Sequence, residues 1–215
     1  MKKKTVALLM AGVLAVGCVI GGTLAWLTTK TDPVVNTFTV GNINITLDES
    51  KYENDALNTE SRVYNNTYKM VPGDTVPKDP KVTVQANSEA CYLFVKIQKS
   101  ENYDTFMENY GTATGWTALT GVTLEPNTAV YYREVSAADA ATGKEFYVLS
   151  GAEPNTTGEI SIKDTVTKTL ANNLTEANYP KLTFTAYACQ KDNVDSVQDA
   201  WTSVNNNGAP VQTTP

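Results

Sequence analysis

The residue types that most often carry catalysis or bind metals are sparse in this sequence. Its 215 residues include three cysteines, Cys18, Cys91 and Cys189, and no histidine. Histidine is the usual general base near neutral pH and the commonest metal ligand in proteins. A Ser-His-Asp triad and an HExxH zinc site are therefore excluded. The sequence predicts a protein that is not an enzyme and that binds no metal or other cofactor.

Cys91 and Cys189 are the two cysteines that follow the N-terminal apolar stretch. In an exported chain they could form one disulfide, and closing a loop of this length would contribute about 4–5 kcal/mol in the chain-entropy account. The alternative is two free thiols, packed as small apolar side chains. The sequence leaves both alternatives open, because a disulfide depends on the local geometry of the backbone.

Two further groups of side chains could bind a ligand. Asp192, Asp195 and Asp199 lack the glycine and the final glutamate of an EF-hand calcium loop, so we interpret them as charges at the start of a helix. A set of aromatic residues could form a glycan-binding surface, although aromatic side chains of a β-sandwich more often pack in the core. That set comprises Tyr92, Trp116, Tyr131, Tyr132 and Trp201.

The N-terminal segment has the composition of an export signal. Three lysines precede an apolar stretch over residues 5–20, and small residues follow it. We expect residues 1–25 to be removed by cleavage between Ala25 and Trp26, and we favour removal over a retained membrane anchor. The protein would then contact the membrane only before cleavage.

Cys18 marks an alternative cleavage site, at which the signal would be removed just before a lipidated cysteine. A lipidated cysteine follows a lipobox, in which a large aliphatic residue stands three positions earlier. Ala15 occupies that position here, so the exit after Ala25 fits the sequence better.

The charge of the chain excludes one class of partner. The sequence has 17 basic and 23 acidic residues, and removal of residues 1–25 leaves 14 basic and 23 acidic ones, a net charge of −9. A strongly acidic surface repels nucleic acid and anionic lipid. We therefore expect a soluble exported protein that does not bind nucleic acid.

The sequence after residue 33 predicts short strands separated by turns that contain Gly, Pro and Asn. Residues 91–97 are predicted to be a strand, and its first half is apolar on both faces, which predicts a central strand. Other predicted strands cover residues 34–40, 43–47, 81–85, 130–132, 146–149, 159–162 and 182–189, and predicted helices cover residues 103–110, 164–174 and 195–201. This pattern predicts an all-β fold, a jelly-roll-like antiparallel β-sandwich with short helical insertions.

The expected domain organisation follows from these elements. Residues 48–202 form the β-sandwich domain, which residues 26–47 complete, and residues 203–215 form a disordered tail. Within the domain, residues 48–67 are charged and rich in asparagine, so they are predicted to be a long loop or a poorly ordered insert.

Cleavage after Ala25 would free residues 26–47 from the membrane. Their apolar residues follow strand-like alternation, with a change of phase at Gly41. Such a segment can pair within its own sheet or add to the sheet edge of another subunit. The candidate donor residues are Val35, Phe38, Val40, Ile43, Ile45 and Leu47.

The sequence also resembles a known family. Residues 22–28 and 36–43 resemble the signal and the mature start of the TasA/camelysin family, secreted proteins with a signal peptide cleaved by the SipW-type peptidase. Further matches lie at residues 70–74, 91–96, 115–117, 131–135, 182–190 and 200–201. The resemblance covers nearly the whole chain except its C-terminal tail.

This resemblance implies a secreted structural protein of the biofilm matrix or cell surface of a monoderm bacterium. Its partners would be the SipW-type signal peptidase, further copies of itself, joined into fibres by N-terminal strand addition, and other matrix proteins. Camelysin is described as a metalloprotease, but a chain without histidine is poorly suited to a catalytic zinc site. The alternative function is a monomeric secreted or surface-associated binding module for a glycan or protein ligand.

Overall fold

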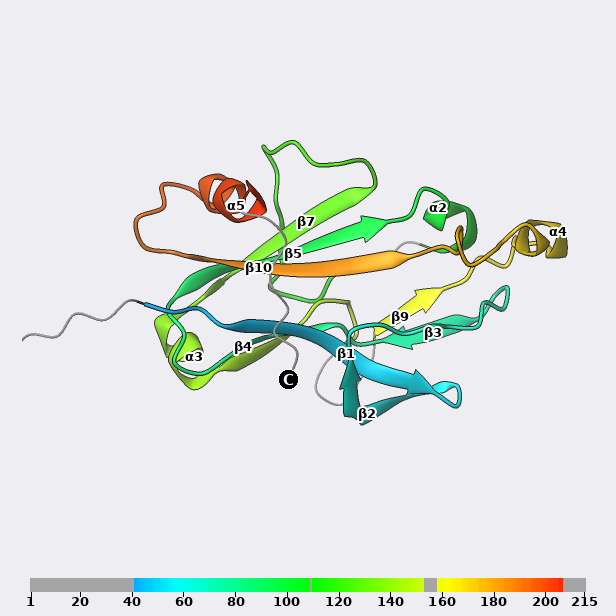
Figure 1. Ribbon diagram of the computed structural model, residues 1–215, viewed down its shortest axis with the longest axis horizontal. Coiled ribbons are helices and arrows are strands. Elements are labelled where there is room, and N and C mark those ends of the chain that lie inside the picture. The colour runs from blue at the N-terminus through cyan, green and yellow to red at the C-terminus, as the bar shows by residue number, and fades with distance from the viewer. Residues whose placement is uncertain (1–40, 109, 153–157, 207–215) are drawn as a thin grey trace, which may run out of the picture. The chain divides into compact units, whose positions relative to one another are not determined.

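Two four-stranded antiparallel sheets pack against each other in this protein, with a two-stranded sheet beside them (Figure 1). The computed structural model describes residues 41–108, 110–152 and 158–206. Within these residues strands predominate and the helices are short, so the predicted all-β sandwich is confirmed.

The strand order places long strands beside short ones. The first sheet has the order β2 (Ala56–Val63), β1 (Ile45–Glu53), β4 (Lys81–Val84) and β8 (Lys144–Tyr147). The second has the order β10 (Leu182–Gln190), β5 (Cys91–Lys99), β7 (Thr128–Val135) and β6 (Thr117–Ala118). The small third sheet pairs β3 (Thr75–Lys78) with β9 (Gly158–Ser161). The helices are α2 (Tyr103–Phe106), α3 (Ala137–Thr142), α4 (Lys168–Asn172) and α5 (Val197–Asn206).

The main core lies between the two larger sheets and is centred on β5. This strand pairs with β10 on one side and β7 on the other, which confirms the predicted central strand. Leu93, Val95 and Ile97 are fully buried on its inner face, where side chains of β4 and β8 meet them. Successive residues of a strand point to opposite faces, so Phe94 is buried on the other side of the sheet.

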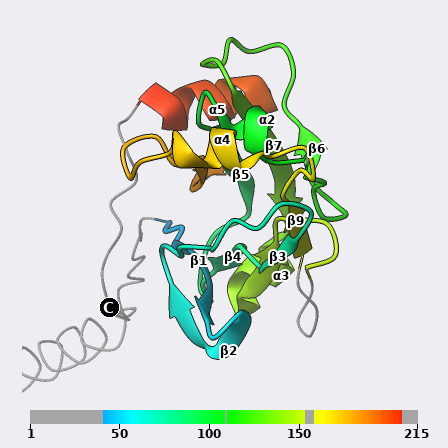
Figure 2. The same ribbon diagram turned by 90° about the vertical axis from the view of Figure 1, so that its right-hand side faces the viewer.

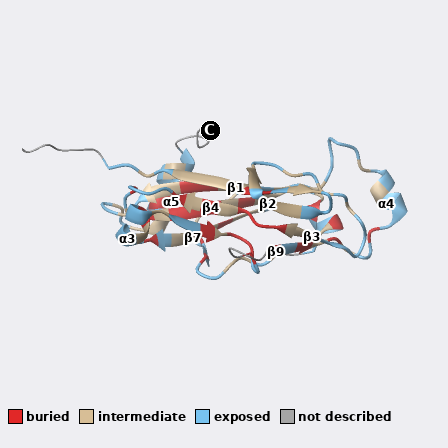
Figure 3. Cartoon of the chain, turned by 90° about the horizontal axis from the view of Figure 1, so that it is seen from below, coloured by how far each residue is buried: buried red, intermediate tan, exposed pale blue. Residues whose placement is uncertain are grey.

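Helix α5 covers this outer face of the second sheet (Figure 2). Its Trp201 ring centroid lies 5.5 Å from that of Phe94 and 5.2 Å from that of Tyr187. Ser196 caps the helix, since its Oγ accepts a hydrogen bond of 3.1 Å from the Asp199 N–H. β5 therefore has buried residues on both faces in its first half, as the apolar sequence of that half predicts. Buried residues, drawn red in Figure 3, gather in the interior of the sandwich, and exposed ones lie mainly in the loops around it.

The structure corrects the prediction of a long loop over residues 48–67. β1 continues to Glu53 and returns as β2, which forms a hairpin with Asn54 and Asp55 at its tip. Both tip residues have left-handed backbone, with φ of 52° and 60°. Asparagine and aspartate tolerate this conformation, which the tight primed hairpin turns require. Polar contacts rather than an apolar face hold this hairpin, so the sequence lacks the expected alternation.

Smaller differences concern the ends of other elements. The helix predicted over residues 103–110 is limited to α2, and the one over 164–174 to α4. Residues 203–206 belong to α5, not to a disordered tail, because Val204 packs against the cluster beneath the helix. Pro72 and Gly73 form a turn before β3: Gly73 has φ of 81°, and the Asp74 N–H donates to the Val71 carbonyl at 3.1 Å.

Candidate functional site: an open side of the sandwich

β10 forms one edge of the second sheet over its nine residues. It pairs with β5 only, in an unbroken register from Leu182–Lys99 to Gln190–Cys91. No described residue pairs with its other side. A long, regular and unprotected edge of this kind is what another strand needs in order to add to a sheet.

The antiparallel ladder determines which backbone groups of β10 are free. The Lys191 N–H donates to the Ala90 carbonyl, and the Ser100 N–H donates to the Lys181 carbonyl. Hydrogen-bonded pairs alternate along such a ladder, so every second residue between these two points faces β5. The residues whose N–H and C=O groups point to the free side are Leu182, Phe184, Ala186, Ala188 and Gln190.

The first four of these residues carry the apolar side chains of β10 that face the main core. Ala186 is buried, whereas Leu182, Phe184 and Ala188 are only partly buried against that cluster. The edge of β10 therefore combines two features. Its backbone groups need hydrogen-bond partners, and its apolar side chains are incompletely covered.

The first half of β1 is a second incomplete edge. Ile45 and Leu47 lie opposite Val84 and Val82 of β4, while the pairing with β2 begins only at Glu49. The Gln85 N–H donates to the Asn44 carbonyl at 2.9 Å, which fixes the ladder phase. The backbone groups of Ile45 and Leu47 consequently point away from β4.

β1 and β10 border the same open side of the sandwich. The two strands approach each other, although no ladder joins them (Figure 1). Ile43, Ile45 and Leu47 pack against the same core as the inner residues of β10, and all three remain partly exposed. An added strand with alternating apolar residues would cover the side chains of both edges.

The structure divides the predicted donor residues into two groups. Ile45 and Leu47 are part of β1, and Ile43 packs beside them in their own domain. These three residues therefore help to form the open side. Val35, Phe38 and Val40 lie outside the described residues, as do Ala25 and Trp26 at the expected cleavage site.

A network of buried charges holds the β1–β2 hairpin beside this open side. The Ser50 N–H and hydroxyl each donate to the Asp79 carboxylate at 2.7 Å, and Asp79 is 3 % exposed. Arg62 of β2 donates through Nη1 to Asp79 and through Nε to Asp48, both at 2.7 Å. Burial alone would lower the pKa of Arg62, but the hydrogen bonds and charges of the two carboxylates outweigh it and raise that pKa.

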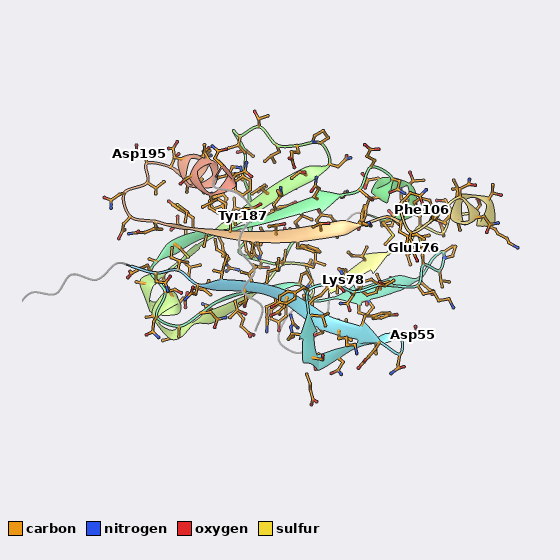
Figure 4. All side chains as sticks on the ribbon, viewed as in Figure 1. Asp55, Lys78, Phe106, Glu176, Tyr187 and Asp195 are labelled. Carbon is orange, nitrogen blue, oxygen red and sulfur yellow. The ribbon has the colours of Figure 1, made fainter. Side chains whose placement is uncertain are left out.

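A second buried ion pair extends this network toward β3. Lys78, labelled in Figure 4, lies beside the β1–β2 hairpin. Its Nζ donates to Glu49 Oε1 at 3.2 Å and lies 2.8 Å from Oε2, which has no hydrogen-bond partner of good geometry. The Lys78 ammonium also lies 4.5 Å from the Tyr68 ring centroid. Burial, followed by the charge of Glu49, raises the pKa of Tyr68 well above its ordinary range. Nothing in the sequence pattern pointed to these charges as buried.

Cys91 and Cys189 are free thiols in the structure. Cys91 lies opposite Gln190, and Cys189 lies opposite Tyr92, so the two cysteines occupy opposite faces of the sheet. Of the two alternatives left open by the sequence, the free thiols are therefore the one found here. Burial, followed by the nearby Cys189, raises the pKa of the Cys91 thiol to about 11.

The other candidate ligand groups do not assemble into a site. Tyr92, Tyr132 and Trp201 pack in the cluster under α5, whereas Trp116 and Tyr131 pack on the opposite face of the sheet. Asp199 interacts with Ser196 at the start of α5. Within the described ranges no three potential metal ligands lie together, and no helix there is long and apolar enough to cross a membrane.

No protein family, curated protein or solved structure matches this chain in the comparisons with known proteins.

Proposed function

We propose that this protein is a secreted structural subunit of a bacterial extracellular matrix or cell surface, and that its subunits join by strand addition. The free edge of β10, with its half-covered apolar face, is the observation that supports this proposal most directly. The resemblance of the sequence to TasA-like proteins agrees with it.

The proposed occupant of the open side is residues 34–40 of a second copy. These residues directly precede the described domain, and Phe38 and Val40 lie two positions apart, so they would share one face of a strand. Backbone hydrogen bonds to β10 would provide affinity, and these two side chains would cover the open core.

The course of the chain before β1 favours a neighbouring subunit over self-pairing. The Glu89 N–H donates to the Asn42 carbonyl and the Gln85 N–H to the Asn44 carbonyl, each at 2.9 Å. These bonds hold residues 42–44 beside residues 85–89, which follow β4. A self-pairing strand would have to reverse direction within the few residues around Gly41.

The test compares the secreted chain starting at Trp26 with a variant that lacks residues 26–40. We expect the first to form fibres in negative-stain microscopy, and the second to stay monomeric with an unchanged β-sheet circular dichroism spectrum. A variant lacking residues 207–215 serves as the matched control and should still polymerise. Fibres formed by the 26–40 deletion at the parental rate would refute the proposal.

A peptide of residues 28–40 tests the same contact in trans. It should raise the melting temperature of the 26–40 deletion variant and slow polymerisation of the parent chain. A peptide with Phe38→Asp and Val40→Asp should do neither, because charged side chains would face the apolar open side.

A further inference from the structure

Arg133 is one of only two arginines in the chain, and among the described residues it has no ionic or hydrogen-bond partner. Arg62, the other one, forms ion pairs of 2.7 Å with Asp48 and with Asp79. Arg133 has neither an ion pair nor a hydrogen bond with any residue in the described ranges, and its Nε is buried without a partner. An unpartnered guanidinium in a partly buried position is costly unless something else satisfies it.

Arg133 lies between two aromatic rings at the side of the sandwich opposite the open edges. It stands on β7 opposite the buried Leu93, so its side chain is on the face directed at the first sheet. Its Cζ is 4.1 Å from the ring centroid of Phe146 on β8 and 5.3 Å from that of Trp116. Both rings are almost fully buried and therefore fixed in place.

The backbone at Gly115 leaves room for this guanidinium. Gly115 has φ of +89°, and a Cβ at this position would lie 2.8 Å from Arg133 Nη2. Any side chain there would both strain the turn and displace the arginine. The glycine, the two rings and β7 together keep the guanidinium in one place.

The guanidinium of Arg133 keeps hydrogen-bond donors available to a ligand. Rings that stack on a guanidinium leave the donors in its plane available. Of the three guanidinium nitrogens only Nε is both buried and unpartnered, so Nη1 and Nη2 are the ones that an outside group can reach. Burial lowers the pKa of Arg133, and the charge of Asp139 only partly offsets this, since Asp139 pairs with Lys144 at 2.9 Å.

We propose that Arg133, held between Trp116 and Phe146, is a binding site for a carboxylate group. A carboxylate has two oxygens in one plane, which match the two Nη donors, and it supplies the missing negative charge. The carboxylate could belong to a small acid such as a uronate or to an acidic side chain of a second copy of this chain. The site does not depend on strand addition, because it lies away from β10.

The presence of only two arginines makes a direct test feasible. The sample is the monomeric fraction of the secreted chain, and NMR records the Nε–H resonances of its two arginines. Sodium acetate, sodium glucuronate and sodium chloride are added in separate titrations at equal ionic strength. We expect a saturable shift of the Arg133 resonance with both carboxylates and none with chloride. The Arg62 resonance should stay in place and report that the fold is intact.

Variants and dilution complete the test. Arg133→Lys and Arg133→Gln should abolish the saturable response, measured through the Trp116 indole N–H.

Lys191→Gln is the control variant. It removes an exposed cation that pairs with Glu134 and lies 5.8 Å from the Tyr92 ring, and it should leave the response unchanged. A shift that follows protein concentration without added acid would identify a second copy as the source. Equal responses to acetate and chloride, or no response in any arm, would overturn the proposal.

Discussion

Asp79 Oδ2 lies 2.7 Å from Arg62 Nη1, and this contact joins the β1–β2 hairpin to the segment between β3 and β4. The Asp79 side chain is 5 % exposed and that of Arg62 is 23 % exposed. The same carboxylate accepts both hydrogen bonds of Ser50. One buried charge therefore satisfies donors from two strands of the hairpin.

Loss of this carboxylate should destabilise the protein strongly. Asp79→Ala leaves Arg62 and Ser50 without their shared acceptor, and we expect a loss of about 3 kcal/mol in the free energy of unfolding. Urea denaturation followed by circular dichroism measures it. Lys51→Ala, which breaks the exposed pair between Lys51 and Glu53, is the control and should change stability by less than about 1 kcal/mol. Equal effects of the two variants would show that the Asp79 network contributes little.

A proline at Ala188 should separate folding from assembly. The Ala188 N–H points to the free side of β10, so its removal breaks no bond of the subunit's own ladder. We expect Ala188→Pro to fold but to polymerise more slowly, as measured by light scattering and microscopy. Ala188→Val keeps the N–H and controls for added bulk. Thr185→Pro should unfold the domain, because the N–H of Thr185 faces β5.

The two thiols should differ in reactivity and in their effect on stability. Cys91 is fully buried with a pKa raised to about 11, whereas Cys189 is partly exposed, so a thiol reagent at pH 8 should modify Cys189 first. A raised pKa means that the folded state holds its proton more tightly than the unfolded state does. Stability should therefore fall as the pH rises from about 9 to about 11.

Tyrosines such as Tyr68, whose pKa is also raised, add to the loss of stability at alkaline pH. Cys91→Ala separates the contribution of the Cys91 thiol from theirs. The variant is less stable at pH 7 because it leaves a small cavity, but it should lose less stability than the parent between pH 9 and 11. Cys189→Ala is the matched control. Parallel stability profiles for the parent and Cys91→Ala would contradict this account of the thiol.

Replacement of Trp201 by alanine should weaken the packing of α5 on the second sheet. The indole is 3 % exposed and contacts the rings of Phe94 and Tyr187, so Trp201→Ala should cost about 3–5 kcal/mol. Hydrogen exchange followed by mass spectrometry should show faster exchange over residues 197–206. Ser196→Ala removes only the cap and should cost about 1 kcal/mol. A Trp201→Ala variant with the exchange pattern of the parent would show that α5 is held by other contacts.

Strands that build the apolar core were predictable from the sequence, and those held by charge were not. Residues 91–97 reveal β5 because burial on both faces of its first half demands apolar residues, and residues 182–189 reveal β10 through the alternation of their side chains. The β1–β2 hairpin escaped prediction because Glu49, Asp79 and Lys78 look like surface residues until the fold brings them together. A local pattern does not reveal partners that are 17 to 29 residues apart.

The candidate site was predictable only in part. The alternation predicts residues 26–47 as one candidate donor segment, but Ile45 and Leu47 belong to β1 of the domain itself, and the change of phase at Gly41 does not by itself indicate such a division. The acceptor edge depends on which strand ends the sheet, and strand order is not encoded in any one segment. The unpartnered state of Arg133 likewise emerges only when β7 and β8 are brought together.

The coincidence of free backbone groups and apolar side chains along β10 has a geometric consequence. A partner strand shifted by one residue would turn its polar side chains into the core, whereas a shift of two residues would restore both the hydrogen bonds and the apolar cover. Two residues of a strand span about 7 Å. Assemblies built on this edge should therefore show axial spacings that differ in discrete steps of that size, a polymorphism detectable by the layer lines of fibre images.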